Sequence, residues 1–269
     1  MKQWLITGAS SGFGRLLAER VATSGDRVIA VARRGDRLRE LAADHDSVSP
    51  LVTDLTAPGI EETIGTAIDD AGGLDVLINN AGYGLFSSVE QTPESEARAL
   101  FDTNLFAPLA VLRAALPSLR KSHGRVVQLS SLLGEVAWLG SGVYSASKAA
   151  IEMAMEGLSL ELAPLGVKVT IVAPGIMATD FAATSHRVMP NETYAPNVGA
   201  FFREFAAQPP EAFGEPSSVV DAILTAVAAD KPPLRLAVGT DAVKQIRGSL
   251  TSRLAEIEQW VDRASKPPA

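Results

Sequence analysis

The segment Thr7-Gly8-Ala9-Ser10-Ser11-Gly12-Phe13-Gly14 joins an apolar run at 4–7 to a segment of helical periodicity that starts near residue 13. Its glycines, spaced G-x-x-x-G-x-G, permit a tight turn and a close approach of the backbone to a ligand. The free N–H groups and the positive dipole end of the following helix attract phosphate. Because the turn stands between the first strand and the first helix, it predicts a nucleotide site. The predicted contacts are Gly8, Ser10, Ser11, Gly12, Phe13 and Gly14.

The rest of the chain alternates short apolar runs with longer helical patterns. Strands are predicted at 4–7, 27–32, 48–52, 76–79, 125–130, 168–173 and 234–238. Helices are predicted near 13–24, 36–43, 59–71, 94–121, 143–163, 217–229 and 241–264. The strands are rich in Val, Ile and Leu without alternation, so both of their faces are expected to be covered. The pattern predicts an α/β fold, a Rossmann-like doubly wound parallel sheet of about seven strands, as a single domain over residues 1–269.

Composition narrows the function of this chain of 269 residues. The 24 Lys and Arg against 31 Asp and Glu give a net charge of −7, so a nucleic-acid partner is not expected. The absence of cysteine excludes disulfides, thiolate metal sites and a cysteine nucleophile. The three histidines are far apart in sequence, so no metal site is expected. No stretch matches a signal peptide or approaches the length of a spanning helix, which predicts a cytoplasmic protein with no membrane partner.

The end of the second predicted strand bears on the choice of cofactor. Sites for NAD usually place Asp or Glu here to hold the ribose 2′-hydroxyl. This chain has Ala32 instead, followed by Arg33 and Arg34. A guanidinium pairs with a 2′-phosphate through two hydrogen bonds. The sequence therefore predicts NADP(H) rather than NAD(H), with Arg33 as the first contact and Arg34 as the second; the alternative is that the pair caps a solvated loop.

The least regular stretch of the sequence is 175–215. It contains four prolines and five of the nine phenylalanines. A long loop inside a compact domain is usually a functional lid or disordered, and the aromatic content argues against disorder. We expect a lid over the substrate; the alternative is a helical excursion that packs only for stability.

The segment Tyr144-Ser145-Ala146-Ser147-Lys148 opens a predicted helix. Tyr144 and Lys148 stand at i and i+4, so they share one helix face, with Cβ atoms about 5–6 Å apart. A free tyrosine has a pKa near 10, and a neighbouring ammonium lowers that pKa. Such a tyrosine can exchange a proton with an alcohol or a carbonyl. By itself this spacing often arises by chance.

Asn104 lies in the long predicted helix, four residues before Pro108. Proline has no N–H, so the carbonyl of residue 104 loses its helical donor. We expect a kink and a free carbonyl at this point; the alternative is a helix that bends only to follow the sheet.

Seven short motifs of this chain follow one another in a recognisable order. They are TGASSGFG at 7–14, Asp54 after the third strand, NNAG at 79–82, Asn104, LSS ending at Ser131, YSASK at 144–148 and PGIMAT at 174–179. In these motifs, which extend over about two-thirds of the chain, the sequence resembles the short-chain dehydrogenase/reductases of the compact single-domain type.

The resemblance implies a role for each matching residue. Tyr144 would be the general acid/base, and Lys148 would lower its pKa and bind the nicotinamide ribose. Ser131 would donate a hydrogen bond to the substrate oxygen, with Ser130 as the competing choice. A water at the Asn104 carbonyl would pass protons to the lysine. The remaining implied cofactor contacts are Asp54 and Leu55 at the adenine, Asn80, Ala81 and Gly82 beside the cofactor, and Pro174, Gly175, Ile176 and Thr179 at the nicotinamide.

The expected function is an NADP(H)-dependent interconversion of a ketone or aldehyde and an alcohol. The expected pocket residues are Tyr83, Phe86, Leu133, Trp138, Phe181 and Met189, which suggest an apolar small-molecule substrate. The alternatives are a regulator that binds NADP(H) without catalysis, and an epimerase or dehydratase that shares the Tyr–Lys pair. Members of the family often form dimers or tetramers through the two long helices. The C-terminal helix, with its apolar stripe, could extend or cover that interface.

Overall fold

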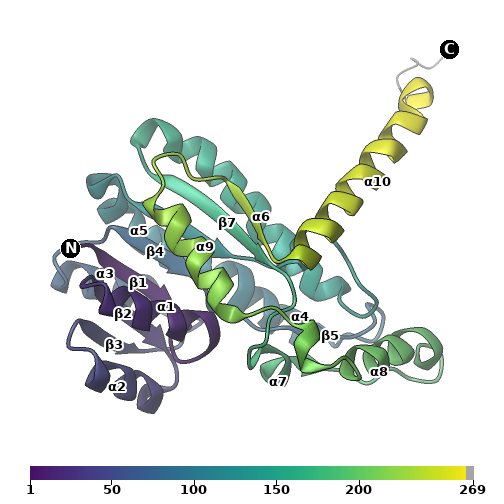
Figure 1. Cartoon of the computed structure of the whole chain (residues 1–269), viewed down its shortest axis with the longest axis horizontal. Helices are drawn as coiled ribbons and strands as arrows, with labels where there is room; N and C mark the ends of the chain where they lie inside the picture. Colours follow the sequence, from purple (N-terminus) through teal and green to yellow (C-terminus); the bar gives the residue numbers. More distant parts are fainter. Residues whose placement is uncertain (265–269) are drawn as a thin grey trace.

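The centre of the molecule is a seven-stranded parallel sheet with the strand order β3-β2-β1-β4-β6-β7-β9 (Figure 1). This computed structural model describes residues 1–264, apart from the side chains at positions 182, 183, 210 and 262–264. The strands are β1 (Gln3–Thr7), β2 (Arg27–Ala32), β3 (Val48–Val52), β4 (Val76–Asn79), β6 (Arg125–Leu129), β7 (Lys168–Pro174) and β9 (Arg235–Val238). Every strand end lies within one residue of its predicted position, and the predicted Rossmann-like α/β fold is confirmed.

Helices cover both faces of the sheet. One face packs against α1 (Gly12–Thr23), α2 (Gly35–Asp44) and α9 (Pro216–Ala228). The other packs against α3 (Ile60–Asp70), α5 (Ala107–Ser122) and α6 (Gly142–Leu162). Successive side chains of a strand point to opposite faces. Trp4 and Ile6 of β1 therefore enter the first cluster and Leu5 the second, and all three are buried. This double burial explains why the strands are continuous apolar runs.

The chain direction across the sheet reverses at β1. From β1 the chain proceeds outward through β2 and β3, then returns to β4 on the other side of β1. In open parallel sheets, ligands bind outside the carboxyl ends of the strands at this point, because the connections there diverge. The glycine-rich turn after β1 and the NNAG segment after β4 both lie at this edge.

The long helix predicted at 94–121 is interrupted. It consists of α4 (Glu94–Phe101), a π-helical turn (Asp102–Phe106) and α5. The turn ends two residues before Pro108, which cannot supply the N–H that the carbonyl of Asn104 would need. The break expected at Asn104 is therefore present.

The same helical run has the length of a membrane span, although it is not an uncharged stretch. Among the described residues, Glu94–Ser122 is long and apolar enough to cross a membrane by length and composition. It nevertheless contacts α3, β4 and α6, and Val111, Ala115 and Leu119 of α5 belong to the core. Its apolar character is accounted for by this packing.

The stretch 175–215 is folded into short elements. It contains α7 (Phe181–Thr184), β8 (His186–Arg187), a π-helical turn (Ala195–Gly199), α8 (Ala200–Ala206) and a 3-10 turn (Pro210–Ala212). β8 pairs with β5 (Leu85–Phe86), a two-residue ladder that the sequence analysis did not predict. The rings of Phe201 and Phe205 pack against Trp138 and each other, and Phe213 stacks on Phe205, which makes one aromatic cluster.

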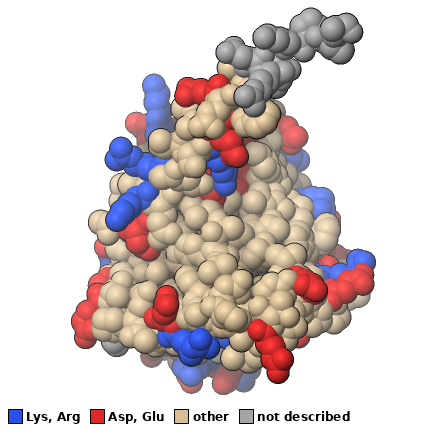
Figure 2. Space-filling view, turned by 90° about the vertical axis from the view of Figure 1, so that its right-hand side faces the viewer, with Lys and Arg blue, Asp and Glu red and all other residues tan. Residues whose placement is uncertain are grey.

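The last helix, α10 (Thr240–Ala264), projects from the body of the molecule (Figure 1). Ala242 and Ile246 pack on the body, whereas the residues from Leu250 to Val261 are exposed. The predicted stripe is part of this exposed stretch, and Leu254 and Ile257 are 57% and 65% exposed. It therefore forms no part of this chain's own core. On this side of the molecule, Lys, Arg, Asp and Glu gather at the rim and leave the centre largely uncharged (Figure 2).

Candidate active site

A cleft of about 990 Å³ opens at the carboxyl edge of the sheet, where the strand order reverses. Its walls include these residues predicted to bind cofactor: Gly8, Ser10, Ser11, Gly12, Phe13, Arg33, Arg34, Asp54, Leu55, Asn80, Ala81, Gly82, Tyr144, Lys148 and Thr179. Six predicted residues are not among its lining residues: Gly14, Asn104, Ser131, Pro174, Gly175 and Ile176. The adjacent residues Phe13, Thr103 and Ser130 line the cleft beside the first three of these, whereas the nearest lining residue to Pro174, Gly175 and Ile176 is Thr179.

The turn after β1 has the geometry of an anion cradle. Gly8 and Gly12 have φ angles of 70° and 53°, in the left-handed region that favours glycine. Ser11 begins α1 without a side-chain cap, so the first N–H groups of the helix have no side-chain acceptor there. A Cβ added to Gly12 would meet nothing within 4 Å, so the space in front of these donors is open. These features fit the phosphates of a dinucleotide.

Asn80 holds this turn in place from the neighbouring strand. Its Nδ2 donates to the carbonyl of Thr7 at 2.8 Å. The Thr7 hydroxyl in turn accepts the N–H groups of Asn80 and Ala81, both at 3.0 Å. The NNAG segment therefore fixes the cradle to β4 through polar contacts.

Gly14 shows how tightly the turn is packed. A Cβ at this position would lie 2.5 Å from both the Gly8 carbonyl oxygen and Asn80 Nδ2. We expect Gly14→Ala to lower the free energy of unfolding by about 1–3 kcal/mol, as overpacking commonly does. The control is Gly65→Ala within α3, where a Cβ meets nothing within 4 Å; it should raise that free energy by roughly 0.5–1 kcal/mol. Urea denaturation of both variants checks this, and equal stability of the two would contradict it.

The two arginines after β2 lie on either side of the cradle. Arg34 donates to the hydroxyls of Ser10 at 3.1 Å and Ser11 at 2.6 Å. Arg33 is 78% exposed, with its guanidinium 4.0 Å from the carboxylate of Asp54. Hydrogen bonds from the Thr56 backbone and hydroxyl lower the pKa of Asp54. Burial opposes them less strongly, and the charge of Arg33 adds a still smaller lowering. Two cations therefore line the cleft near Asp54, a predicted adenine contact.

Tyr144 is buried at the start of α6, with a neighbouring serine at its phenol. The hydroxyl of Ser131 accepts the Leu133 N–H at 3.1 Å, which leaves its own proton free. Burial raises the pKa of Tyr144 above its ordinary value, and the hydrogen bond from Ser131 opposes that rise. The hydroxyl of Ser130 instead donates to Glu152. Of the two serines considered, Ser131 is thus the one at the phenol.

Lys148 lies one helical turn beyond Tyr144. Its Nζ is 5.9 Å from the centre of the Tyr144 ring and donates to the carbonyl of Leu129 at 3.1 Å. Burial lowers the pKa of Lys148 to about 8, and the charge of Glu152 opposes that shift. The predicted lowering of the Tyr144 pKa by this lysine is not seen: burial, which the sequence does not reveal, raises that pKa, and the effect that opposes the rise is the hydrogen bond of Ser131.

Asn104 ties three segments together beside the lysine. Its Nδ2 donates to the carbonyl of Tyr83 at 3.0 Å and to Ser147 Oγ at 3.1 Å, and its Oδ1 accepts the Tyr83 N–H at 3.2 Å. A Cβ at Gly82 would lie 3.0 Å from Asn104 Oδ1 and 3.5 Å from Lys148 Nζ. The side chain is thus held by three hydrogen bonds, while Pro108 supplies no N–H to the backbone carbonyl of Asn104.

Aromatic rings flank the phenol on the predicted substrate side. The rings of Phe86 and Phe181 lie 5.7 and 5.9 Å from that of Tyr144. Tyr83 and Phe181 line the cleft. Leu133 is buried in one apolar cluster with Tyr144, against which Tyr83 and Phe86 pack. Trp138 faces the aromatic cluster and donates to Gln245 at 2.8 Å.

Two residues differ from the predicted substrate pocket: Met189 was predicted to line it, and His186 was not. Met189 is 70% exposed, so it does not enclose a pocket in this structure. His186, which the sequence analysis did not select, lines the cleft. Its ring lies 5.2 Å from that of Tyr83, and its Nδ1 is 3.0 Å from Glu96. In the sequence, the feature that pointed to His186 was its position within the stretch 175–215, which was expected to cover the substrate.

A doubly wound parallel sheet with a glycine-rich cradle and a Tyr–Ser–Lys group at its carboxyl edge defines a dinucleotide-binding oxidoreductase. A family model described as short chain dehydrogenase matches residues 2–189. The chain belongs to this family, and the predicted resemblance is confirmed.

Individual proteins of known structure or name agree with this assignment. A short-chain dehydrogenase from Streptomyces avermitilis superposes with a TM-score of 0.89 and 40% identity, covering 98% of each chain. Another from Burkholderia cenocepacia J2315, in complex with NADP, has a TM-score of 0.77 and 28% identity over 99% of this chain and 98% of that chain. A 3-ketodihydrosphingosine reductase from Bacteroides thetaiotaomicron is 35% identical over 242 residues, 87% of this chain and 87% of that protein.

Proposed function

We propose that this oxidoreductase uses NADP(H) to interconvert an apolar ketone or aldehyde and its alcohol. The observation that carries the proposal is the buried phenol of Tyr144, with the Ser131 hydroxyl at its oxygen and Lys148 one turn beyond, at the edge of the cleft. A donor pair of this kind matches a carbonyl oxygen that gains negative charge during reduction.

Different residues of the cleft would bind different parts of the cofactor. The cradle after β1 would hold the pyrophosphate, and Arg33 and Arg34 the 2′-phosphate. Asp54 and Leu55 would border the adenine. Thr179, with the backbone from Pro174 to Ile176, would border the nicotinamide, which supplies or accepts the hydride when bound.

The proton chemistry would belong to Tyr144 and its neighbours. Ser131 and Tyr144 would hold the substrate oxygen, and Tyr144 would donate its proton to it as charge develops. Lys148 would return a proton to the phenolate, supplied through a water at the backbone carbonyl of Asn104. Oxidation of an alcohol is the same sequence in reverse.

Two observations support the substrate class. The rings beside the phenol are apolar, from Phe86 and Phe181. The relative from Bacteroides thetaiotaomicron is named a 3-ketodihydrosphingosine reductase. A hydrophobic carbonyl compound is therefore the class to test first.

The pKa of Lys148 gives a prediction for pH dependence. The lysine is a cation below about pH 8 and loses its proton above it. Since the cation returns the proton to Tyr144, we expect kcat for reduction to be constant below this pH and to fall as pH rises through it. Steady-state rates with saturating NADPH across this range check the prediction. A flat profile would contradict the assigned role of Lys148.

The proposed function is tested by NADPH oxidation with a panel of aromatic and long-chain ketones and aldehydes, set against a panel of 2-oxo acids. We expect turnover with the apolar panel. Tight NADPH binding without turnover on either panel would favour the non-catalytic regulator. Conversion of an added alcohol or sugar without net change in NADPH would favour an epimerase or dehydratase.

A further inference from the structure

Glu152 is a buried carboxylate that the proposed reaction does not use. It lies on α6 one turn beyond Lys148 and is 3% exposed. It accepts a hydrogen bond from the hydroxyl of Ser130, which immediately precedes Ser131 in the sequence. A Cβ at Gly134 would overlap its carboxyl group, so the loop that follows Ser131 packs directly on it.

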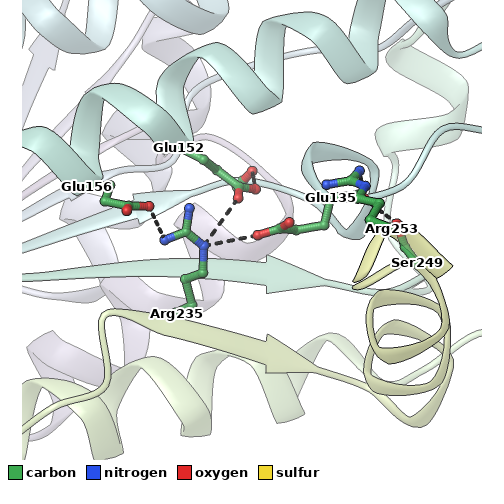
Figure 3. Close-up of polar contacts among 7 residues, drawn as sticks. Glu135, Glu152, Glu156, Arg235, Ser249 and Arg253 are labelled. Atoms are coloured by element: carbon green, nitrogen blue, oxygen red, sulfur yellow. Dashed lines mark hydrogen bonds and ion pairs between the residues drawn. The ribbon is translucent and has the colours of Figure 1, made fainter. Parts of the chain in front are cut away.

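A cation from β9 anchors this carboxylate. Arg235 Nε lies 4.0 Å from Glu152 and 3.0 Å from Glu135, and its Nη1 lies 2.8 Å from Glu156 (Figure 3). One arginine thus joins carboxylates from α6 and from the end of the loop. Such an arrangement holds the loop against the helix as well as balancing charge.

The C-terminal helix holds the same loop from a third side. The backbone carbonyl of Glu135 accepts the hydroxyl of Ser249 at 3.0 Å and the guanidinium of Arg253 at 2.6 Å, both from α10 (Figure 3). The loop 131–135 is therefore fixed by α6, β9 and α10 together.

The direction of two adjacent side chains connects this cluster to the phenol. Ser131 has extended backbone angles, φ −162° and ψ 157°, and the N–H of Ser130 continues the ladder by donating to Val172 at 2.8 Å. Successive side chains of an extended chain point to opposite sides. Because Glu152 holds Ser130 on one side, Ser131 is directed to the other, toward Tyr144.

The charge of Glu152 acts on the lysine as well. Burial raises the pKa of Glu152 to about 7; the Ser130 hydrogen bond opposes this, nearby Glu135 adds to it, and Arg235 opposes it. In its ionised form the carboxylate raises the pKa of Lys148 against the effect of burial. An ionised Glu152 thus favours the cationic form of Lys148.

We propose that Glu152 is a positioning residue, which directs Ser131 toward Tyr144 by binding Ser130 and which Arg235 holds in place. The inference rests on the proposed function, since it assigns Glu152 a part only if Ser131 and Tyr144 hold the substrate oxygen.

Three variants and one control test the proposal. Glu152→Ala removes the acceptor, Glu152→Gln keeps an acceptor oxygen without the charge, and Ser130→Ala removes the donor. The control is Glu156→Gln, which changes the charge beside the same arginine but has no contact with Ser130. Kd for NADPH and thermal unfolding accompany every kcat measurement.

We expect Glu152→Ala and Ser130→Ala each to lower kcat about tenfold, with the Kd for NADPH unchanged. Glu152→Gln should retain most of the wild-type kcat. The fall of its kcat at alkaline pH should begin at a lower pH than in wild type, because Lys148 loses a neighbouring negative charge. The double variant should be no slower than the slower single one, since both remove one interaction. Glu156→Gln should leave kcat unchanged, and also the pH at which kcat falls. A crystal structure of Ser130→Ala should show the Ser131 hydroxyl turned from Tyr144.

Several results would overturn the inference. If wild-type protein turns over and both Glu152 variants equal it in kcat and pH profile, the inference fails while the proposed function stands. A loss of several hundredfold in Ser130→Ala alone would make Ser130 itself the donor to substrate. Absence of wild-type turnover on every carbonyl would overturn the proposed function and this inference with it. Should Glu152→Ala unfold, Glu152→Gln and Ser130→Ala carry the test.

Discussion

Replacing Tyr144 by phenylalanine is expected to lower kcat for carbonyl reduction about a thousandfold, within the range that general acid catalysis contributes. The ring fills the same buried space between Phe86 and Phe181, so packing is retained. What is lost is the proton that the growing oxyanion receives, while Ser131 can still donate a hydrogen bond. The Kd for NADPH should change little, because the cradle and both arginines are untouched.

The matched control for this substitution is Tyr194→Phe. The hydroxyl of Tyr194 donates to Glu90 at the surface, away from the cleft. This variant should retain the wild-type kcat. Single-turnover rates with saturating NADPH compare the two directly. Near-normal turnover in Tyr144→Phe would remove the phenol from the proposed reaction.

Removing both arginines after β2 is expected to abolish the preference for NADPH. Charge-assisted hydrogen bonds contribute about 1.5–3 kcal/mol each, so the KM for NADPH should rise at least tenfold in Arg33→Ala/Arg34→Ala. NADH has no 2′-phosphate, so its KM should rise much less, and only through the loss of the Arg34 contacts to the cradle. The ratio of kcat/KM for the two cofactors is the quantity to measure.

The single variants separate two roles within this pair. Arg33 is exposed, so Arg33→Ala should affect only the 2′-phosphate. Arg34 also holds the hydroxyls of Ser10 and Ser11, so Arg34→Ala should weaken binding of both cofactors through the cradle. Arg98→Ala, which loses only a surface pair with Glu94, is the control. Preference for NADH in the wild-type protein would refute the cofactor assignment.

The sheet could be predicted closely because its strands are buried on both faces. Burial on both faces produces continuous apolar runs with turn residues at each end, and these survive as a pattern in the sequence. The ladder of β5 and β8 has only two residues per strand, too short for any periodicity. The break near Asn104 could be predicted because a single residue, Pro108, removes the donor.

The positions of the candidate site residues could be predicted from the sequence more closely than their pKa shifts. The spacing of Tyr144 and Lys148 indicated proximity, but the direction of the Tyr144 pKa depends on burial by distant rings. Glu152 was missed because a glutamate four residues after a lysine is typical of a solvated helix face. Its burial depends on Arg235 and Gly134, which are distant in sequence. Oligomeric state and the partner of the α10 stripe stay predictions.

The central claim is that the cleft holds a nicotinamide next to a carbonyl whose oxygen lies at Tyr144. The most direct measurement uses NADPH with deuterium at both C4 positions of the dihydronicotinamide together with a ketone from the apolar panel, followed by mass spectrometry of the alcohol. We predict one deuterium on the carbinol carbon with wild-type protein and almost none with Tyr144→Phe in the same time. An unlabelled alcohol, or equal labelling by both proteins, would contradict the account.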